Sequence, residues 1–458
     1  MKTLFKNCSI LLRKDNKYIT LENAFLGVNK DCIDYIDAYY PEDKYDVEKD
    51  MTGKLLMPGL INAHGHEPMV LLRGVGSNKK LEDWLHDSVF PVEDKLRPVD
   101  MLVGSELGIL EMLASGTTCF SNMYFFPYPT LDAAARSGIK LNNAFTGICF
   151  DPNMEAKDWV RYQKIQRLID LFVEGKENDP EIKIQLGFDK LPDYFYSAIK
   201  ENRVRLDLSI HSHYLSTTKF NQGTVEQLKK YNFPIQLHAS ESISEVEECK
   251  QKYGLTPIKY FDSLGVFDAH NAYVAHCVHI SNEELKILKQ KDATIVYNPS
   301  SNMKLGSGVA PITEALELGI NVAIGTDGCA SNNNLDMFEE MHLGALIASG
   351  FNKDAKGIDI NKIIDMATIN GAKALGRDDT GVLEVGKKAD IIALDLSKPH
   401  LVPNIDTASL IVYSAHGSDV CMTMVDGKIL YEDGKYFTLD KDDIYKRLEK
   451  TLEHLYKK

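Results

Sequence analysis

The chain has 458 residues, of which 44% are hydrophobic and 26% are charged, as in an ordinary globular protein. Its 52 basic and 66 acidic side chains give a formal charge of −14, which argues against a nucleic-acid-binding protein, because such proteins usually carry a basic face. No stretch reaches the roughly 20 apolar residues that a membrane-spanning helix needs. We therefore expect a globular protein that binds neither nucleic acid nor a membrane.

The first 56 residues have the pattern of short β-strands separated by turns. Four segments are rich in aliphatic and β-branched residues, namely 9–12, 18–21, 24–28 and 32–36. Polar residues or glycine separate them, as expected of strand connections. We therefore expect residues 1–56 to contribute strands to a small β domain.

The middle of the chain, residues 57–381, alternates short apolar runs with amphipathic stretches. The apolar runs are 60–62, 118–122, 141–145, 206–211, 235–238, 272–276, 294–298 and 322–327. Strands that alternate with helices indicate βαβ units, and seven or eight units over about 320 residues fit a closed (β/α)₈ TIM-type barrel. A doubly wound sheet is the alternative, but no glycine-rich phosphate-binding turn follows the first strand.

One connection of the predicted barrel is longer than the others. Residues 151–205 are rich in charge, and 158–173 have a helical pattern, so we expect an insertion over the barrel. Residues 382–440 return to the strand pattern, with a hairpin turn at Asp426-Gly427. Together with residues 1–56 they predict a small β-sandwich domain built from both chain ends. The apolar spacing in residues 441–458 predicts a C-terminal amphipathic helix.

The eight cysteines are sparse and form no CxxC pair. In a chain of this length they are typical of reduced thiols in a cytoplasmic protein, and a disulfide-bonded framework is the alternative. The short apolar stretch after Asn7 is broken by Arg13, Lys14 and Asp15 and lacks the small-residue cleavage site of a signal peptide. We therefore expect a cytoplasmic protein.

Side chains that can bind a metal gather at the carboxyl ends of the predicted strands: His64, His66, His238, His276 and Asp327 each end or follow an apolar run. In a barrel these ends face the active site, and two histidines two residues apart on a strand point the same way. Singly, each has a structural explanation, such as a hydrogen-bonded histidine or an aspartate that begins a turn. Together, three imidazoles and a carboxylate suit Zn²⁺ or Fe²⁺ with positions left open for water.

Longer motifs surround these residues. They are 58–66 (PGLINAHGH), 71–75 (LLRGV), 116–120 (GTTCF), 275–279 (AHCVH), 298–306 (NPSSNMKLG), 325–328 (GTDG), 330–333 (ASNN) and 386–390 (GKKAD). With these motifs the chain resembles the amidohydrolase superfamily over nearly its whole length, and within it the 5′-methylthioadenosine/S-adenosylhomocysteine deaminases and their chlorohydrolase relatives. The resemblance implies a metal-dependent hydrolytic deaminase of an adenine nucleoside, such as 5′-methylthioadenosine, adenosine or S-adenosylhomocysteine, that releases ammonia.

The same resemblance implies the roles of individual residues. The metal ligands would be His64, His66, His238 and Asp327, and the catalytic residues would be Glu241, His276 and Asp327. The predicted fourth strand runs into His211 instead of the lysine that bridges two metals in some relatives, which favours one ion, Zn²⁺ with Fe²⁺ as the alternative. The ion would lower the pKa of a bound water from 15.7 toward ~7. Asp327 would take its proton, His276 would orient the hydroxide, and Glu241 would pass a proton to the ring.

Substrate binding follows less directly from the resemblance. The substrate-binding residues would be Trp84, Glu93, His211, His276 and Ser331. Glu93 would accept hydrogen bonds from the two ribose hydroxyls, because a carboxylate offers only acceptors, and Trp84 would face the 5′ substituent. Relatives that take S-adenosylhomocysteine carry arginines after the third strand, where this chain has 146–149 (TGIC). Arg161 or Arg167 would have to replace those arginines.

Two other functions stay open from the sequence. One is an aminohydrolase of a guanine, pterin or triazine type of ring, which would not need Glu93. The other is a catalytically inactive barrel that acts as a binding protein. The intact set of ligand and catalytic residues argues against this second alternative. We expect a small-molecule substrate, and the sequence leaves a homo-oligomer open.

Overall fold

The barrel consists of eight parallel strands in a single sheet. In this computed structural model, which describes residues 1–79, 81–149, 160–177, 179–355 and 357–457, the sheet order is β13-β12-β11-β10-β9-β8-β7-β6. The strands are β6 (Leu60–Asn62), β7 (Thr117–Tyr124), β8 (Lys140–Phe145), β9 (Val204–Ile210), β10 (Ile235–Ala239), β11 (Ala272–His276), β12 (Thr294–Tyr297) and β13 (Val322–Ile324). Nearly all their residues are buried, as expected of a parallel sheet covered by helices. The predicted barrel is confirmed, strand by strand.

The first and last strands meet through their carboxyl ends. The Ala63 N–H donates to the Ile324 carbonyl at 3.0 Å, and the Asp327 N–H donates to the His64 carbonyl at 3.1 Å. Gly325 makes this approach possible, because a Cβ there would lie 2.6 Å from the His64 carbonyl oxygen. The contact that closes the barrel thus brings two predicted metal ligands together.

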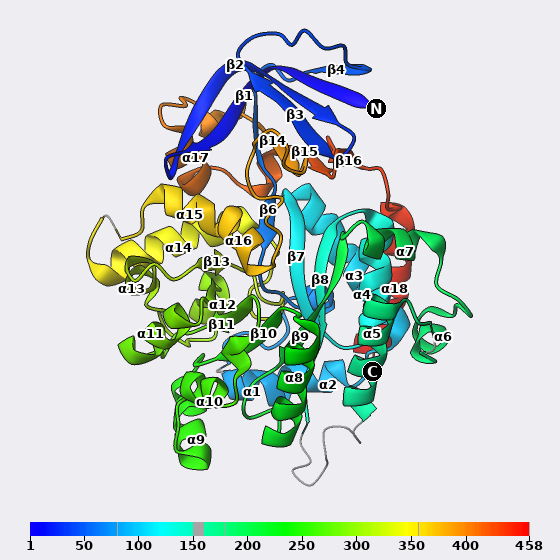
Figure 1. The fold of residues 1–458 in the computed structure, drawn as a ribbon, viewed down its shortest axis with the longest axis vertical. Coiled ribbons are helices and arrows are strands. Elements are labelled where there is room, and N and C mark those ends of the chain that lie inside the picture. The colour runs from blue at the N-terminus through cyan, green and yellow to red at the C-terminus, as the bar shows by residue number, and fades with distance from the viewer. Residues whose placement is uncertain (80, 150–159, 178, 356, 458) are drawn as a thin grey trace.

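Helices surround the barrel, as Figure 1 shows. After β6 come η1 (Glu67–Leu72), α1 (Leu81–Trp84), η2 (Leu85–Val89), α2 (Phe90–Glu93) and α3 (Pro98–Ala114), and after β7 comes α4 (Pro127–Ser137). The later ones are α8 (Thr218–Tyr231), α9 (Ile243–Tyr253), α10 (Pro257–Ser263), η4 (Val266–Asp268), α11 (Asn282–Gln290), α12 (Pro299–Lys304), α13 (Ile312–Glu317), α14 (Met337–Asn352), α15 (Ile360–Ala367) and α16 (Ile369–Ala374). Polar side chains cap several of them; Ser281 and Glu284 form a capping box at α11.

The insertion between β8 and β9 contains three helices, α5 (Val160–Glu174), α6 (Glu181–Leu186) and α7 (Asp193–Lys200). The helix predicted over 158–173 is confirmed from residue 160 onward, and 158–159 lie outside the described residues. Its apolar face, which includes Ile165, Leu168 and Ile169, is buried.

Both chain ends form one nine-stranded sheet with the order β17-β16-β15-β14-β5-β1-β2-β3, in which β4 also pairs with β1. Its strands are β1 (Lys2–Lys14), β2 (Lys17–Asn29), β3 (Cys32–Asp37), β4 (Val47–Asp50), β5 (Lys54–Pro58), β14 (Ile391–Asp395), β15 (Val420–Val425), β16 (Lys428–Glu432) and β17 (Lys435–Tyr436). The strand β5 joins the two ends, because it pairs with β1 on one side and with β14 on the other. The strands expected at 18–21 and 24–28 are one strand, since the register shift against β1 and the positive φ of Asn23 accommodate the polar residues between them.

The remaining C-terminal elements are η5 (Pro399–Leu401), α17 (Thr407–Tyr413), η6 (Gly417–Asp419) and α18 (Lys441–Tyr456). The predicted C-terminal helix is confirmed as α18, which buries Ile444 and Leu455 and packs against α3. None of the helices in the described ranges combines the length and apolar character needed to cross a membrane. The domain boundaries given above, 1–56, 57–381, 382–440 and 441–458, stay predictions.

Candidate active site

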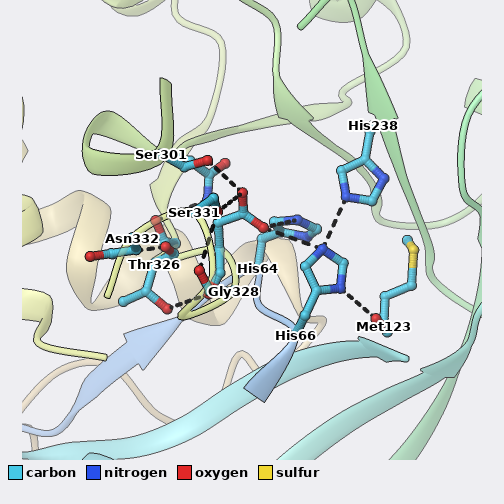
Figure 2. Close-up of polar contacts among 12 residues, drawn as sticks. His64, His66, Met123, His238, Ser301, Thr326, Gly328, Ser331 and Asn332 are labelled. Carbon is cyan, nitrogen blue, oxygen red and sulfur yellow. Dashed lines mark hydrogen bonds and ion pairs between the residues drawn. The ribbon is translucent and has the colours of Figure 1, made fainter. Parts of the chain in front are cut away.

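Five of the six predicted ligand and catalytic side chains meet at one end of the barrel, and the sixth, Glu241, is described below. His64 and His66 follow β6, His238 lies in β10, His276 ends β11, and Asp327 follows β13. The ring of His64 lies 5.0 Å from that of His66, 4.8 Å from that of His238 and 5.9 Å from that of His276, measured between centroids. Figure 2 shows His64, His66 and His238 converging on one centre. This end of the barrel, near α1, α2 and α9, lies away from the nine-stranded sheet (Figure 1).

The spacing of the donor atoms fits one cation. The Nε2 atom of His66 lies 3.2 Å from Oδ1 of Asp327 and 3.3 Å from Nε2 of His238, and Nε2 of His64 lies 3.7 Å from the same Oδ1. Ligand atoms that surround Zn²⁺ tetrahedrally at 2.0–2.1 Å lie roughly 3.3 Å apart. In addition, Nε2 of His64 is buried and has no hydrogen-bond partner in the described part of the chain. Three imidazoles and a carboxylate therefore fit a divalent metal ion.

The outer nitrogens of these histidines are held by acceptors. His66 Nδ1 contacts the Met123 carbonyl at 2.5 Å, and His238 Nδ1 contacts the His211 carbonyl at 2.9 Å. A carbonyl can only accept, so each Nδ1 carries the proton and each Nε2 presents its lone pair to the centre. Burial lowers the pKa of His64 and of His238 well below the usual value, which keeps both imidazoles neutral and able to bind a metal.

Asp327 is fixed by two hydroxyl groups. Ser301 Oγ and Ser331 Oγ donate to its Oδ2 at 2.7 and 3.0 Å, which leaves Oδ1 facing His64 and His66. Burial opposes ionisation of Asp327, but the adjacent imidazole of His66 and the imidazoles of His276 and His64 lower its pKa well below the usual range. Its φ of 60° is in the left-handed region that non-glycine residues rarely adopt, as is common at functional sites.

Glu241 and His276 face each other beside the cluster. His276 Nε2 lies 3.7 Å from Oε2 of Glu241, and its Nδ1 contacts Oδ1 of Asn302 at 2.9 Å. Glu241 is 5% exposed, and this burial raises the pKa of its carboxyl. A carboxyl with a raised pKa beside a histidine is the arrangement expected of a proton-transfer pair.

A narrow cavity of about 70 Å³ lies over the cluster, and three of the four residues expected only to bind substrate line it: Trp84, Glu93 and His211. Tyr124 donates to Oε1 of Glu93 at 2.5 Å, and burial raises the pKa of Glu93 to about 7. Ser331 is not among the lining residues; its hydroxyl donates to Asp327 instead.

Sequence reasoning missed three of the contacts described above, those made by Tyr124, Ser301 and Asn302. Tyr124 ends the second barrel strand, and strand-end position was the signal that could have found it. Ser301 and Asn302 lie within the motif at 298–306, but that motif gave them no role.

A second cavity of about 500 Å³ adjoins the first and shares with it Phe90, Glu93, Phe125, Ile148 and Leu215. Phe126, Phe145 and Leu96 extend its apolar wall. The cation that lines it, Lys164, pairs with Glu181 at 3.0 Å, and Gln185 donates to the same carboxylate at 2.7 Å. Arg167 pairs with Asp179 at 2.9 Å, and the side chain of Arg161 lies outside the described part of the structure.

Comparisons with known proteins find relatives over nearly the whole chain. The model of the amidohydrolase family matches residues 55–430. A Thermoanaerobacter pseudethanolicus protein named 5-methylthioadenosine/S-adenosylhomocysteine deaminase is 39% identical over 458 residues, covering 99% of each chain. A Methanocaldococcus jannaschii protein named 5′-deoxyadenosine deaminase is 37% identical over 406 residues, covering 89% of this chain and 90% of its own. A Xanthomonas campestris adenosine deaminase structure with bound zinc superposes with a TM-score of 0.86 at 27% identity, covering 99% of this chain and 98% of its own.

Proposed function

Because this chain belongs to the amidohydrolase family, we propose that it hydrolyses the exocyclic C–N bond of an adenine nucleoside and releases ammonia. The observation that carries this proposal is the convergence of three histidines, Asp327 and the Glu241–His276 pair in one buried site. The names of the relatives, which are adenine nucleoside deaminases, support the same reaction.

We propose that His64, His66, His238 and Asp327 hold a single Zn²⁺ ion. The buried Nε2 of His64, which lacks a partner among the described residues, and the zinc in a structural neighbour support this assignment. When bound, such an ion lowers the pKa of water and so provides a nucleophile at neutral pH. His211, and not a lysine, follows the fourth strand, which supports one ion instead of a bridged pair.

The chain's own side chains would move the protons. Asp327, ionised and held through Oδ2, would accept the proton of the attacking water at Oδ1. With Nδ1 held by Asn302, His276 directs Nε2 toward Glu241 and would orient the attacking oxygen. Glu241, whose pKa is raised by burial, would give its proton to the ring nitrogen beside the reacting carbon. The proton that Asp327 took from water would then pass to the departing amino group, and Glu241 would regain its proton from the new hydroxyl group as ammonia leaves.

The shape of the two cavities suggests how the nucleoside lies. Glu93 stands at their boundary, where it would accept the ribose hydroxyls, with Trp84 and His211 on the catalytic side. The 5′ substituent would then enter the second cavity, among the rings of Phe90, Phe125 and Phe126. Because Lys164 is already paired there, this cavity favours an uncharged 5′ substituent over the amino-acid end of S-adenosylhomocysteine.

We further propose that the enzyme works in the cytoplasm. The eight cysteines are sparse for a chain of this length and form no CxxC pair, which supports a reducing compartment.

An ammonia-release assay tests the proposed function. It should use the protein reconstituted with Zn²⁺ and compare adenosine, 5′-deoxyadenosine, 5′-methylthioadenosine, S-adenosylhomocysteine and guanine by kcat/KM, which measures differential transition-state binding. We expect turnover of the nucleosides and its loss in Glu241→Gln. Turnover of guanine without turnover of any nucleoside would reject a nucleoside as the substrate and leave the deaminase chemistry in place.

A further inference from the structure

Glu241 lies on a strained turn between β10 and α9. Ser240, which precedes it, has a φ of 57°, in the left-handed region where a side chain is unfavourable. The backbone N–H groups of Ser240 and Glu241 both donate to the carboxylate of Glu245, at 3.0 and 2.6 Å. Two successive N–H groups that converge on one anion form a nest, and here a side chain of the same chain fills it.

The hydrogen bonds of Glu245 differ from those of an ordinary helix cap. Glu245 is the third residue of α9, and its N–H donates to the capping Ser242 at 3.1 Å. In a capping box the carboxylate at this position returns to the N–H of the capping residue, as Glu284 does with Ser281 in α11. The carboxylate of Glu245 reaches one and two residues further back than this, to the N–H groups of the turn that carries Glu241.

The other side of this turn is tied to the segment after His276. The carbonyls of Ala239 and Ser240 accept the N–H groups of Cys277 and His279, at 3.2 and 2.8 Å. Glu245 is 5% exposed and does not line the catalytic cavity. It therefore acts on the backbone of the turn and not on a bound molecule.

We propose that Glu245 is a positioning residue: its carboxylate holds the strained turn so that the carboxylate of Glu241 stays beside Nε2 of His276. This inference rests on the proposed role of Glu241 as the proton-transfer group. A proton donor must lie within hydrogen-bonding reach of its acceptor, and a misplacement of about 1 Å can lower a rate by ~10²-fold. The effect of Glu245 on catalysis should therefore require the carboxyl group of Glu241.

A double-mutant cycle tests this dependence. The variants are Glu245→Gln, Glu241→Gln and the double variant. Glu284→Gln is the matched control, because it removes a buried helix-cap carboxylate from another barrel helix, α11. For each one, kcat, KM, bound metal and Tm are measured. We expect Glu245→Gln to lower kcat by about 10- to 100-fold with KM within about threefold and the metal retained. In the Glu241→Gln background the same change should alter kcat by less than about twofold.

The outcomes separate this inference from the function on which it rests. A wild-type kcat in Glu245→Gln, while Glu241→Gln is inactive, overturns the positioning role alone. Losses that multiply in the double variant, or an equal loss in Glu284→Gln, overturn it as well, because they indicate general destabilisation. A wild-type kcat in Glu241→Gln overturns the proposed role of Glu241 and this inference together. If Glu245→Gln does not fold, Glu245→Asp, which keeps the charge but withdraws it from the turn, is expected to show the same dependence on Glu241.

Discussion

Glu93→Ala is the substitution that most directly tests how the nucleoside is recognised. Glu93 lines both cavities, and its Oε1 already accepts the Tyr124 hydroxyl at 2.5 Å, so Oε2 is the atom available to the ribose hydroxyls. A hydrogen bond to a charged group contributes about 1.5–3 kcal/mol. We expect the change to Ala to weaken transition-state binding of a riboside by roughly 2–3 kcal/mol, which is about a 30- to 150-fold loss in kcat/KM.

The assay compares adenosine with 2′-deoxyadenosine on both proteins. The wild type should prefer the riboside, and Glu93→Ala should treat the two substrates almost equally, because the group that distinguishes them is gone. Asp87→Ala, which removes an exposed carboxylate from the neighbouring helix η2, is the control and should keep the wild-type ratio. If Glu93→Ala lowered kcat/KM equally for both substrates, Glu93 would not bind the 2′-hydroxyl, and its assignment as the ribose-binding residue would be wrong.

Four further outcomes are expected. His64→Ala and His238→Ala should lose both metal and activity, and elemental analysis of the wild type should find one zinc per chain; two metals per chain would refute the single site. Glu241→Gln should keep the metal and lose at least ~10²-fold in kcat, and a wild-type rate would require another acid. 5′-Methylthioadenosine should be used at least as well as S-adenosylhomocysteine, since Lys164 is paired with Glu181; a strong preference for S-adenosylhomocysteine would require an unpaired cation at the second cavity. Because burial raises the pKa of Glu93 to about 7, its carboxyl is protonated below that pH and ionised above it. The preference for riboside over 2′-deoxyriboside should therefore rise from pH 6 to pH 8, and Glu93→Ala should abolish that rise.

The barrel could be predicted because its strands carry a strong local signal. Strands buried on both faces are continuous apolar runs, and each proposed metal ligand lies where such a run ends. The N-terminal sheet was less predictable, because Glu22 and Asn23 interrupt the apolar pattern although β2 continues through them as a bulged strand. A polar interruption has the same appearance in sequence whether it is a turn or a bulge.

The supporting contacts of the site could not be predicted, because they depend on tertiary register. The hydrogen bonds from Ser301 to Asp327 and between His276 and Asn302 each join residues 26 positions apart on different barrel units. Glu245 illustrates a different limit. Its spacing from Ser242 predicts an ordinary capping box, and only the path of the chain shows that its carboxylate holds the turn before the helix.

The position of β5 between strands from opposite chain ends has a consequence for protein synthesis. Pro58 pairs with Ile391, so 391 − 58 = 333 residues must be made after Pro58 before its partner exists. At ~5–20 residues per second, the edge of β5 that β14 will cover stays without its partner for roughly 20 to 70 seconds. Leu55 and Leu56, fully buried in the finished protein, lie in that strand throughout the interval. The nascent chain therefore carries an apolar, unpaired strand edge for most of its translation, and such an edge favours aggregation until β14 covers it.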